Sequence, residues 1–405
     1  MKIAMVSCHA NPLAAMGGVD SGGQNVHVAA LSAALVGHGH EVVVFTRRDS
    51  EAAPDVVRAP DGYDLVHVPA GPPEKVPKDE LLPHMQEFAC GLRDHFSRYD
   101  FDVVHSHFWT SGLTASLASR TCNLPVVHTF HALGIVKRRY QGAADTSPPE
   151  RIPLECKLGQ SVDAVAATCS DEVFELVRMG VPRSHITVVP SGVDVEEFRP
   201  DGPRAPRSDR LRLTSIGRLV PRKGFDVAIR SLPKLPYAEL VIAGGPADGD
   251  VADDVEGQRL LALAVDLGVA DRLAMPGPIP RTLMPELLRS TDVVVCSPWY
   301  EPFGIVPLEA MACSKPVVAS AVGGLTDTVV DSITGIHVPP RNSDALARAL
   351  HGLLGEPVRR EEFGHAGRDR AVQRYSWDRI ADETERIYES VTRHHLARSA
   401  GSVGR

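Results

Sequence analysis

Two cationic side chains, Arg218 and Lys223, lie five residues apart in the segment GRLVPRKGFD (217–226). Pro221 lies between them and favours a turn, so both charged ends can converge on one point. Two fixed cations of this kind can neutralise a departing diphosphate without a metal ion. An exposed basic loop is the alternative, but a position directly after an apolar run favours a phosphate site.

Two carboxylates, Glu301 and Glu309, lie eight residues apart in EPFGIVPLE (301–309). Carboxylate oxygens accept hydrogen bonds from vicinal hydroxyls, so each glutamate could grip one sugar of a nucleotide sugar. Residues 303–306 lie at the start of a helical pattern, where backbone N–H groups serve anions and hydroxyls well. Helix capping and solvent exposure are the alternative explanation for either glutamate alone.

A glycine-rich segment, GGVDSGGQN (17–25), follows the first strand-like run and leads into a helical one. Its glycines allow the backbone to approach a ligand closely, and the helix start offers free N–H groups. The segment is not a GxGxxG fingerprint, which disfavours a dinucleotide-binding dehydrogenase. A flexible strand-to-helix loop is the alternative.

Four histidines, His105, His107, His128 and His131, lie at the ends of two strand-like runs. They could suggest a metal site, but no carboxylate or cysteine completes a ligand set, so we predict no metal. At least two of the four are expected to be buried core residues. His131 is the one expected to reach the active site.

Short apolar runs rich in β-branched residues alternate with longer helical patterns along the whole chain. Such runs are typical of strands covered on both faces, and their alternation with helices predicts doubly wound parallel sheets. In the helical segment 22–36, Val28, Leu31 and Leu35 share one face. The predicted strands are 2–7, 41–46, 102–107, 125–131, 164–169 and 186–191 in the first half and 211–217, 239–245, 272–277, 292–298, 316–320 and 336–340 in the second.

The two series of strands meet at a linker, EEFRPDGPRAPRSDR (196–210), which is rich in Pro, Arg and Asp and poor in apolar residues. We therefore predict an α/β protein of two facing Rossmann-like domains, 1–195 and 196–375, followed by a purely helical end. Ligands bind beyond the carboxyl ends of the strands in such sheets. The active site is thus expected in an interdomain cleft.

The composition is that of an ordinary globular chain of 405 residues, with 43% hydrophobic and 23% charged residues. A net charge of −8 without a basic stripe argues against a nucleic-acid partner. No apolar run approaches the ~18 residues that span a bilayer. The seven cysteines are scattered and form no CxxC, which argues against disulfides or a zinc site and for a cytoplasmic protein.

Taken together, these motifs resemble the retaining glycosyltransferases of family 4, which have the GT-B fold. The E-x7-E element from Glu301 to Glu309, followed by AMACSKPVVASAVGG, is the strongest marker. The stretches CHANPL, DSGGQNVHV and HSHFWTSGL are similar to the D-inositol 3-phosphate glycosyltransferases of mycothiol biosynthesis and to the sucrose-phosphate synthases. The resemblance covers essentially the whole chain.

The resemblance implies a role for each matching residue on the donor side. Arg218 and Lys223 would neutralise the diphosphate, Glu301 would hold the sugar hydroxyls, and Glu309 would bind the ribose. His131 would approach the transferred sugar, so His131, Arg218, Lys223 and Glu301 are the implied catalytic residues. The implied donor site consists of Gly22, Gly23, Arg218, Lys223, Ile279, Glu301, Phe303, Gly304, Ile305, Val306 and Glu309.

On the acceptor side, this sequence departs from the inositol-phosphate enzymes. Phe108 replaces a tyrosine and Ala132 replaces a threonine among the residues that hold the acceptor phosphate. Losing hydroxyl donors weakens a phosphate site, which favours a neutral cyclitol, sugar or polyol, although Lys78 keeps an anionic acceptor open. The implied acceptor site consists of His9, Asp20, Gln24, Asn25, Lys78, Phe108 and Arg151.

The resemblance therefore implies transfer of glucose or N-acetylglucosamine from UDP-glucose or UDP-N-acetylglucosamine to a small polar acceptor, with no cofactor and no metal. An epimerase of the same fold, or a non-catalytic protein that binds UDP-sugars, is the alternative. The resemblance also implies that the last helix, within 376–405, packs back on the first domain. The oligomeric state stays open, a homodimer included.

Overall fold

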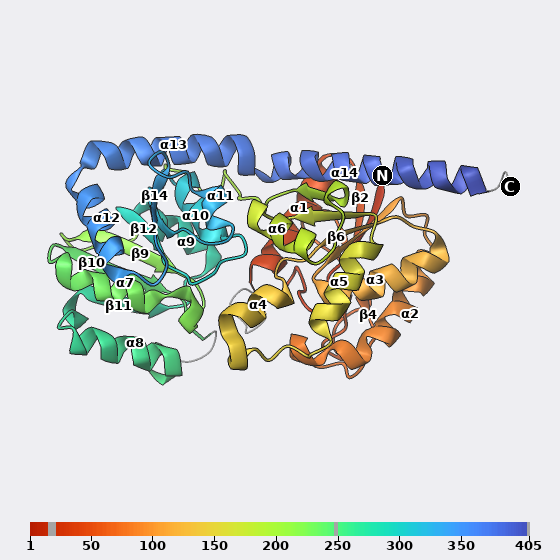
Figure 1. The fold of residues 1–405 in the computed structure, drawn as a ribbon, viewed down its shortest axis with the longest axis horizontal. Helices are drawn as coiled ribbons and strands as arrows, with labels where there is room; N and C mark the ends of the chain where they lie inside the picture. The colour runs from red at the N-terminus through yellow and green to blue at the C-terminus, as the bar shows by residue number, and fades with distance from the viewer. Residues whose placement is uncertain (15–21, 247–249, 403–405) are drawn as a thin grey trace. The chain divides into compact units, whose positions relative to one another are not determined.

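Two α/β units make up the protein, and each is a largely parallel sheet with helices packed against it (Figure 1). The structure, a computed structural model, describes residues 1–14, 22–246 and 250–402. Within these, unit 1 comprises 1–14, 22–190 and 377–402, and unit 2 comprises 191–246 and 250–376. The chain passes from unit 1 to unit 2 between Pro190 and Ser191 and returns at Trp377.

Unit 1 is built on a sheet of eight described strands in the order β3-β4-β2-β1-β5-β6-β7-β8. All neighbours pair in parallel except β3 and β4. The six strands predicted here are confirmed, and β3 and β4 are additional. The strands are β1 (Lys2–Val6), β2 (Glu41–Arg47), β3 (Val56–Arg58), β4 (Asp64–Val68), β5 (Val103–His107), β6 (Val126–Thr129), β7 (Ala164–Ala167) and β8 (Ile186–Val188).

The helices of unit 1 cross between these strands, except the last. The first of them buries the predicted face, because Val28, Leu31 and Leu35 are fully buried against the sheet. The helices are α1 (Gly23–Gly37), α2 (Met85–Phe96), α3 (Trp109–Cys122), α4 (Gly134–Gln141), α5 (Arg151–Ser161), α6 (Ser170–Arg178) and α14 (Trp377–Ser402).

Unit 2 is built on a fully parallel sheet of six described strands in the order β11-β10-β9-β12-β13-β14, and all six were predicted. The strands are β9 (Leu211–Ile216), β10 (Ala238–Ala243), β11 (Leu273–Gly277), β12 (Val293–Cys296), β13 (Val317–Ser320) and β14 (Gly335–Val338). The helices are α7 (Phe225–Ser231), α8 (Val255–Asp266), α9 (Met284–Arg289), α10 (Ile305–Ala312), α11 (Leu325–Thr328), α12 (Ser343–Gly355) and α13 (Pro357–Tyr375).

Helix α14, dark blue in Figure 1, belongs to unit 1 although it follows the whole of unit 2 in the sequence. Its residues Ile380, Ile387 and Tyr388 are buried in the same core cluster as β1 and α1. The Tyr388 hydroxyl and Nδ1 of His105 on β5 lie 2.7 Å apart, which ties the helix to the centre of the sheet. Among the described helices, none combines the length and the hydropathy needed to cross a membrane.

Candidate active site

In unit 2, the loops after β9 and β12 bring Lys223 and Glu301 into contact. These strands are neighbours in the sheet, and Lys223 Nζ donates to Glu301 Oε2 over 2.6 Å. Arg222 Nη1 lies 3.8 Å from the same oxygen. Burial raises the pKa of Glu301, but the charges of Lys223, Arg222 and Arg218 outweigh this effect and lower the pKa below its usual value. Glu301 is therefore an ionised carboxylate in a strongly cationic environment.

Close backbone contacts fix this arrangement. Gly224 has φ of +67°, and a Cβ at this position would lie 2.0 Å from the carbonyl oxygen of Ser297. The Ser297 hydroxyl donates to the Gly224 carbonyl over 2.8 Å, and the Trp299 N–H donates to the Arg222 carbonyl over 2.8 Å. The loop that carries Lys223 is thus bound directly to the loop that leads to Glu301.

Helix α10 begins next to this ion pair. Phe303 is buried, and Gly304 at the N-cap has φ of +85°, so the chain turns sharply before Ile305 and Val306 start the helix. The first N–H groups of a helix have no partner within the helix and can serve an anion or a hydroxyl. A crevice of about 40 Å³ lies here, and Lys223, Glu301 and residues 304–307 are among the residues that line it.

Glu309 lies on α10, buried at 5% exposure, and its partner is Arg281, whose Nη1 donates to Oε1 over 2.7 Å. Arg281 is the first residue of the short 3-10 helix Arg281–Leu283, which follows β11. Ile279 lies between β11 and this helix. The predicted donor residues of unit 2 therefore all lie after the carboxyl ends of β9, β11 and β12.

In unit 1, His131 lies two residues after β6 and is partly exposed. Its φ of +60° is in the left-handed region, which few residues other than glycine adopt. Its Nε2 lies 3.0 Å from Nδ1 of His107, and its ring packs edge-on against His27 at 4.9 Å between centroids. Burial, followed by the nearby histidines, lowers the pKa of His131 well below its usual value. The ring is therefore neutral.

The other three histidines of the group lie in the core of unit 1, which confirms the expectation that at least two would be buried. Burial lowers the pKa of each, to about 3 for His128. Their contacts are His105 with Tyr388 and Thr129, His107 with Met5 and His131, and His128 with Ser106.

Three predicted acceptor residues lie in contact with one another at the carboxyl ends of β1 and β5. The rings of His9 and Phe108 are 4.6 Å apart, and the Arg151 guanidinium lies 4.9 Å from the centre of the Phe108 ring. Phe108 has φ of +75°, an unfavourable conformation for a non-glycine residue. Three N–H groups of Arg151 are used within the fold: they donate to Glu155 at 2.7 Å, to the Ala132 carbonyl at 2.8 Å and to Ser147 at 3.2 Å.

The glycine-rich segment is described only from Gly22 onward, so Asp20 lies outside the described residues. Gly22 is the N-cap of α1 and Gly23 its first residue. Asn25 is buried and bonds to Gly22 N–H and to the Asn11 carbonyl, whereas Gln24 donates to Ser7 and the His107 carbonyl. Both side chains thus hold the loops together at the carboxyl ends of β1 and β5.

Lys78 begins the short 3-10 helix Lys78–Glu80 and is partly exposed. The adjacent Asp79 pairs with Lys137 at 3.1 Å, and Lys137 donates to Ser147, which also accepts from Arg151. Hydrogen bonds therefore connect the Lys78 segment to the group of His9, Phe108 and Arg151. Lys137 is a cation in this region that the sequence motifs did not indicate.

Two family descriptions match almost the whole chain. Glycosyltransferase Family 4 matches residues 21–197, and Glycosyl transferases group 1 matches residues 200–370. A D-inositol 3-phosphate glycosyltransferase of Xylanimonas cellulosilytica is 37% identical, over 98% of each chain. The chain is a family 4 glycosyltransferase. A second D-inositol 3-phosphate glycosyltransferase, from Kribbella flavida, is 36% identical over 96% of each chain.

Solved structures place this glycosyltransferase in the GT-B fold, as predicted. A sucrose-phosphate synthase of Thermosynechococcus elongatus is 29% identical and superimposes with a TM-score of 0.87, over 96% of this chain and 99% of that one. The HepE protein of Anabaena, solved with UDP-glucose, has a TM-score of 0.72 at 18% identity, over 97% and 99% of the two chains, and shares the fold.

Two arginines of this glycosyltransferase that contact predicted donor residues were missed from the sequence. Arg222 lies beside Glu301, and Arg281 pairs with Glu309. The signal for Arg222 was its position next to Lys223 in the same turn. Arg281 directly follows the segment that contains Ile279, but its pairing with a residue 28 positions away is a tertiary contact.

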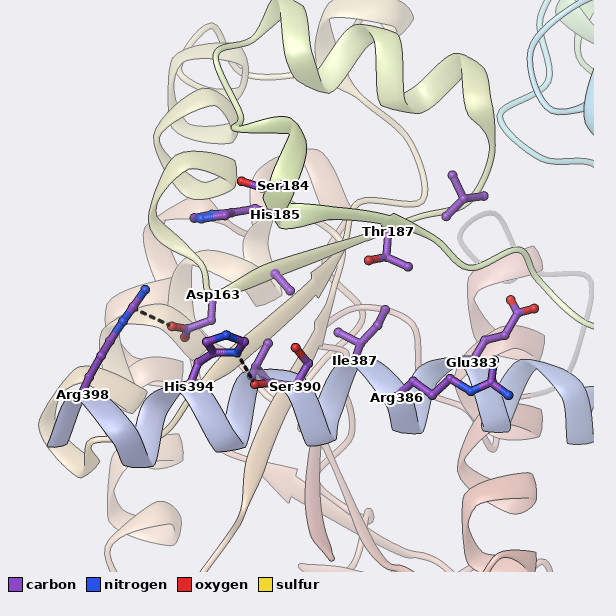
Figure 2. A pocket seen from close by; sticks show the side chains of 13 residues that line it. Asp163, Ser184, His185, Thr187, Glu383, Arg386, Ile387, Ser390, His394 and Arg398 are labelled. Carbon is purple, nitrogen blue, oxygen red and sulfur yellow. Dashed lines mark hydrogen bonds and ion pairs between the residues drawn. The ribbon is translucent and has the colours of Figure 1, made fainter. Parts of the chain in front are cut away.

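A larger cavity of about 650 Å³ lies elsewhere in unit 1 of this transferase. Figure 2 shows that α14 forms one wall, with Arg386, Ser390 and His394, and that the segments around His185 and Asp163 form the other. Asp163 and His185 precede β7 and β8, so the cavity lies at the amino ends of the strands. None of the predicted site residues that the structure describes lines it.

Proposed function

We propose that this chain is a retaining glycosyltransferase that moves a hexosyl unit, glucose or N-acetylglucosamine, from a UDP-sugar to a hydroxyl of a small polar acceptor. The observation that carries the proposal is the contact of Lys223 with Glu301, beside Arg222 and the start of α10. This contact places cations for a diphosphate and an ionised carboxylate for sugar hydroxyls in one place.

On the donor side, we assign the diphosphate to Arg218 and Lys223 and the sugar hydroxyls to Glu301 and the backbone of residues 303–306. Glu309, held by Arg281, would accept hydrogen bonds from the ribose. The donor nucleotide is proposed as UDP, and the Anabaena structure with UDP-glucose shows that the same fold accommodates such a ligand. Gly22 and Gly23, at the start of α1, are proposed as further donor-binding residues.

The proposed reaction is a front-face substitution. The acceptor hydroxyl would attack the anomeric carbon on the side from which the diphosphate leaves, and a diphosphate oxygen would accept the hydroxyl proton. Arg218 and Lys223 would stabilise the charge that develops on the leaving group, the term that usually contributes most to such catalysis. His131 is neutral and could offer a hydrogen bond to the transferred sugar. No step in this scheme requires a metal.

The acceptor is proposed to be a cyclitol, a sugar or a sugar phosphate, bound by unit 1. The relatives from Xylanimonas and Kribbella are named for an inositol phosphate. In this chain, however, Glu155 and the Ala132 carbonyl already hold the Arg151 guanidinium, and Phe108 offers no hydroxyl. Asp79, Asp145 and Ser147 likewise hold the Lys137 ammonium. A phosphate would therefore depend mainly on Lys78, and we expect the neutral acceptor to be used at least as well as the phosphorylated one.

Release of UDP from UDP-glucose and UDP-N-acetylglucosamine, with and without a panel of cyclitols, sugars and their phosphates, tests this proposal. Lys223→Ala should lower turnover by roughly 100-fold or more, since one lost donor to the developing charge costs that much. Lys234→Ala removes a lysine of unit 2 whose partner, Asp344, is exposed, and it should leave turnover unchanged. Near-normal turnover in Lys223→Ala would reject the proposal.

A further inference from the structure

A cluster of polar side chains joins α14 to the residues that follow α1, far in the sequence from the proposed active site. Asp378, Asp382 and Glu385 lie one turn apart on α14 and therefore share one face of the helix. His38, directly after α1, contacts all three carboxylates: Asp378 at 2.8 Å, Glu385 at 2.7 Å and Asp382 at 4.0 Å.

The two ring nitrogens of His38 have different partners. Nε2 lies 2.8 Å from Asp378 and Nδ1 lies 2.7 Å from Glu385. A metal ion that replaces the proton on Nδ1 would leave the ring donating its remaining N–H to Asp378. An imidazole that donates its second N–H to a carboxylate is the usual arrangement of a metal-bound histidine. Nδ1, Asp382 Oδ1 and Glu385 Oε1 would then be three electron-pair donors that lie within 4.8 Å of one another.

Neighbouring groups orient both carboxylates. The main-chain nitrogen of Met1 lies 3.0 Å from Nδ1 of His40, so His40 carries its proton on Nε2 and donates it to Glu385 Oε1 over 3.0 Å. Arg379 donates to Oδ2 of Asp382 over 3.3 Å, which leaves Oδ1 directed at His38. These contacts are the outer-shell hydrogen bonds that metal sites require.

We propose that His38, Asp382 and Glu385 bind one divalent ion of the zinc class, with water completing the coordination. Their candidate ligand atoms all lie within 4.8 Å of one another. Bonds of about 2.0–2.2 Å in a tetrahedral site put ligand atoms roughly 3.3 to 3.6 Å apart, so only small side-chain movements are needed. The side chains are 20–36% exposed, which leaves room for water.

The ion would fasten α14 to the end of α1 and so stabilise unit 1. It takes no part in the transfer reaction proposed above, and the two proposals can fail independently. A nitrogen and two carboxylate oxygens form a ligand set that suits Zn²⁺ better than Mg²⁺, because Mg²⁺ prefers oxygen ligands alone.

Calorimetric titration of the chelator-treated full chain with ZnCl₂ at pH 7.5 tests the site. We expect a single site per chain whose affinity falls about 10-fold or more in Asp382→Asn and in His38→Gln. His394→Gln removes an exposed histidine from the same helix and should bind zinc as the wild type does. Asp382→Asn preserves the size of the side chain, and unchanged circular dichroism would show that it folds.

Thermal unfolding gives a second readout, because an ion that binds only the folded state raises the unfolding temperature. Zinc should raise it in the wild type and in His394→Gln but not in Asp382→Asn. The absence of a saturable site would overturn the proposal. Unchanged zinc binding in both site variants would overturn it too, since the ion would then bind elsewhere, for example at the buried group of His27, His107 and His131.

Discussion

Arg151 and Glu155 form an ion pair in the interior of unit 1, with exposed fractions of 2% and 0%. The pair braces the chain after β6, because Arg151 bonds to the Ala132 carbonyl and Glu155 accepts from the Gly134 N–H. A residue predicted to bind substrate thus also supports the loop that presents His131. Its sequence neighbours gave no indication of this structural role.

Replacing Arg151 by Met should therefore destabilise unit 1 by roughly 3–5 kcal/mol, because Glu155 is left buried without its partner. Urea denaturation followed by circular dichroism measures the change. The exposed pair of Arg58 and Asp64 is the matched control, and Arg58→Met should cost less than about 1 kcal/mol. Equal effects in the two variants would show that the buried pair is not structural.

At the scale of single residues, the candidate site residues could be predicted from the sequence more readily than the residues that they contact. Lys223 and Glu301 were singled out because each belongs to a compact motif, and their contact follows from β9 and β12 being neighbours. Arg281 could not be found in this way, because its pairing with Glu309 depends on how the β11 loop packs on α10. The positive φ of Phe108 is likewise set by the fold, since no local signal marks it.

The turn between β9 and α7 depends on Gly224, which combines a positive φ with a close approach to Ser297. Gly224→Ala should displace the turn that carries Lys223 and lower both the unfolding temperature and the rate of transfer, the latter by at least about 10-fold. Gly268→Ala is the control, because Gly268 has almost the same φ, +66°, but open space around it. If both variants behaved alike, backbone strain alone would be responsible.

At the scale of elements, the continuous apolar runs identified every central strand of both sheets. β3 and β4 were missed: β3 (VVR) contains only two consecutive apolar residues, and nothing in the composition of β4 (DLVHV) distinguishes it from the strands that were predicted. The order of strands in each sheet could not be read from local sequence, since pairing of distant segments determines it. The linker was predicted from composition at 196–210, close to the change of unit at Ser191.

Across the whole molecule, the histidines whose pKa values are lowered by burial all lie in unit 1. The pKa of His27 falls to about 4 and that of His128 to about 3, against a usual value of about 6.5. At a pH between these lowered pKa values and the usual one, the histidines are protonated in the unfolded chain but not in the folded one. The contribution of these buried histidines to the stability of unit 1 is therefore complete above pH 6.5 and falls as the pH drops toward 4.

Scanning calorimetry at pH 8 and pH 5 checks this dependence, and we expect a clearly lower unfolding temperature at pH 5. The decrease should affect the part of the transition that arises from unit 1. An unfolding temperature that is the same at both values would mean that the buried histidines are protonated in the folded state as well.

Because α14 supplies Ile380, Ile387 and Tyr388 to the core of unit 1, that core is assembled from both ends of the chain. A ribosome synthesises the sheet of unit 1 first and these residues only after it has made all of unit 2. The nascent amino-terminal half therefore emerges with an apolar surface that its own residues cannot cover. We expect it to need a chaperone or to wait, partly folded, until α14 has been synthesised.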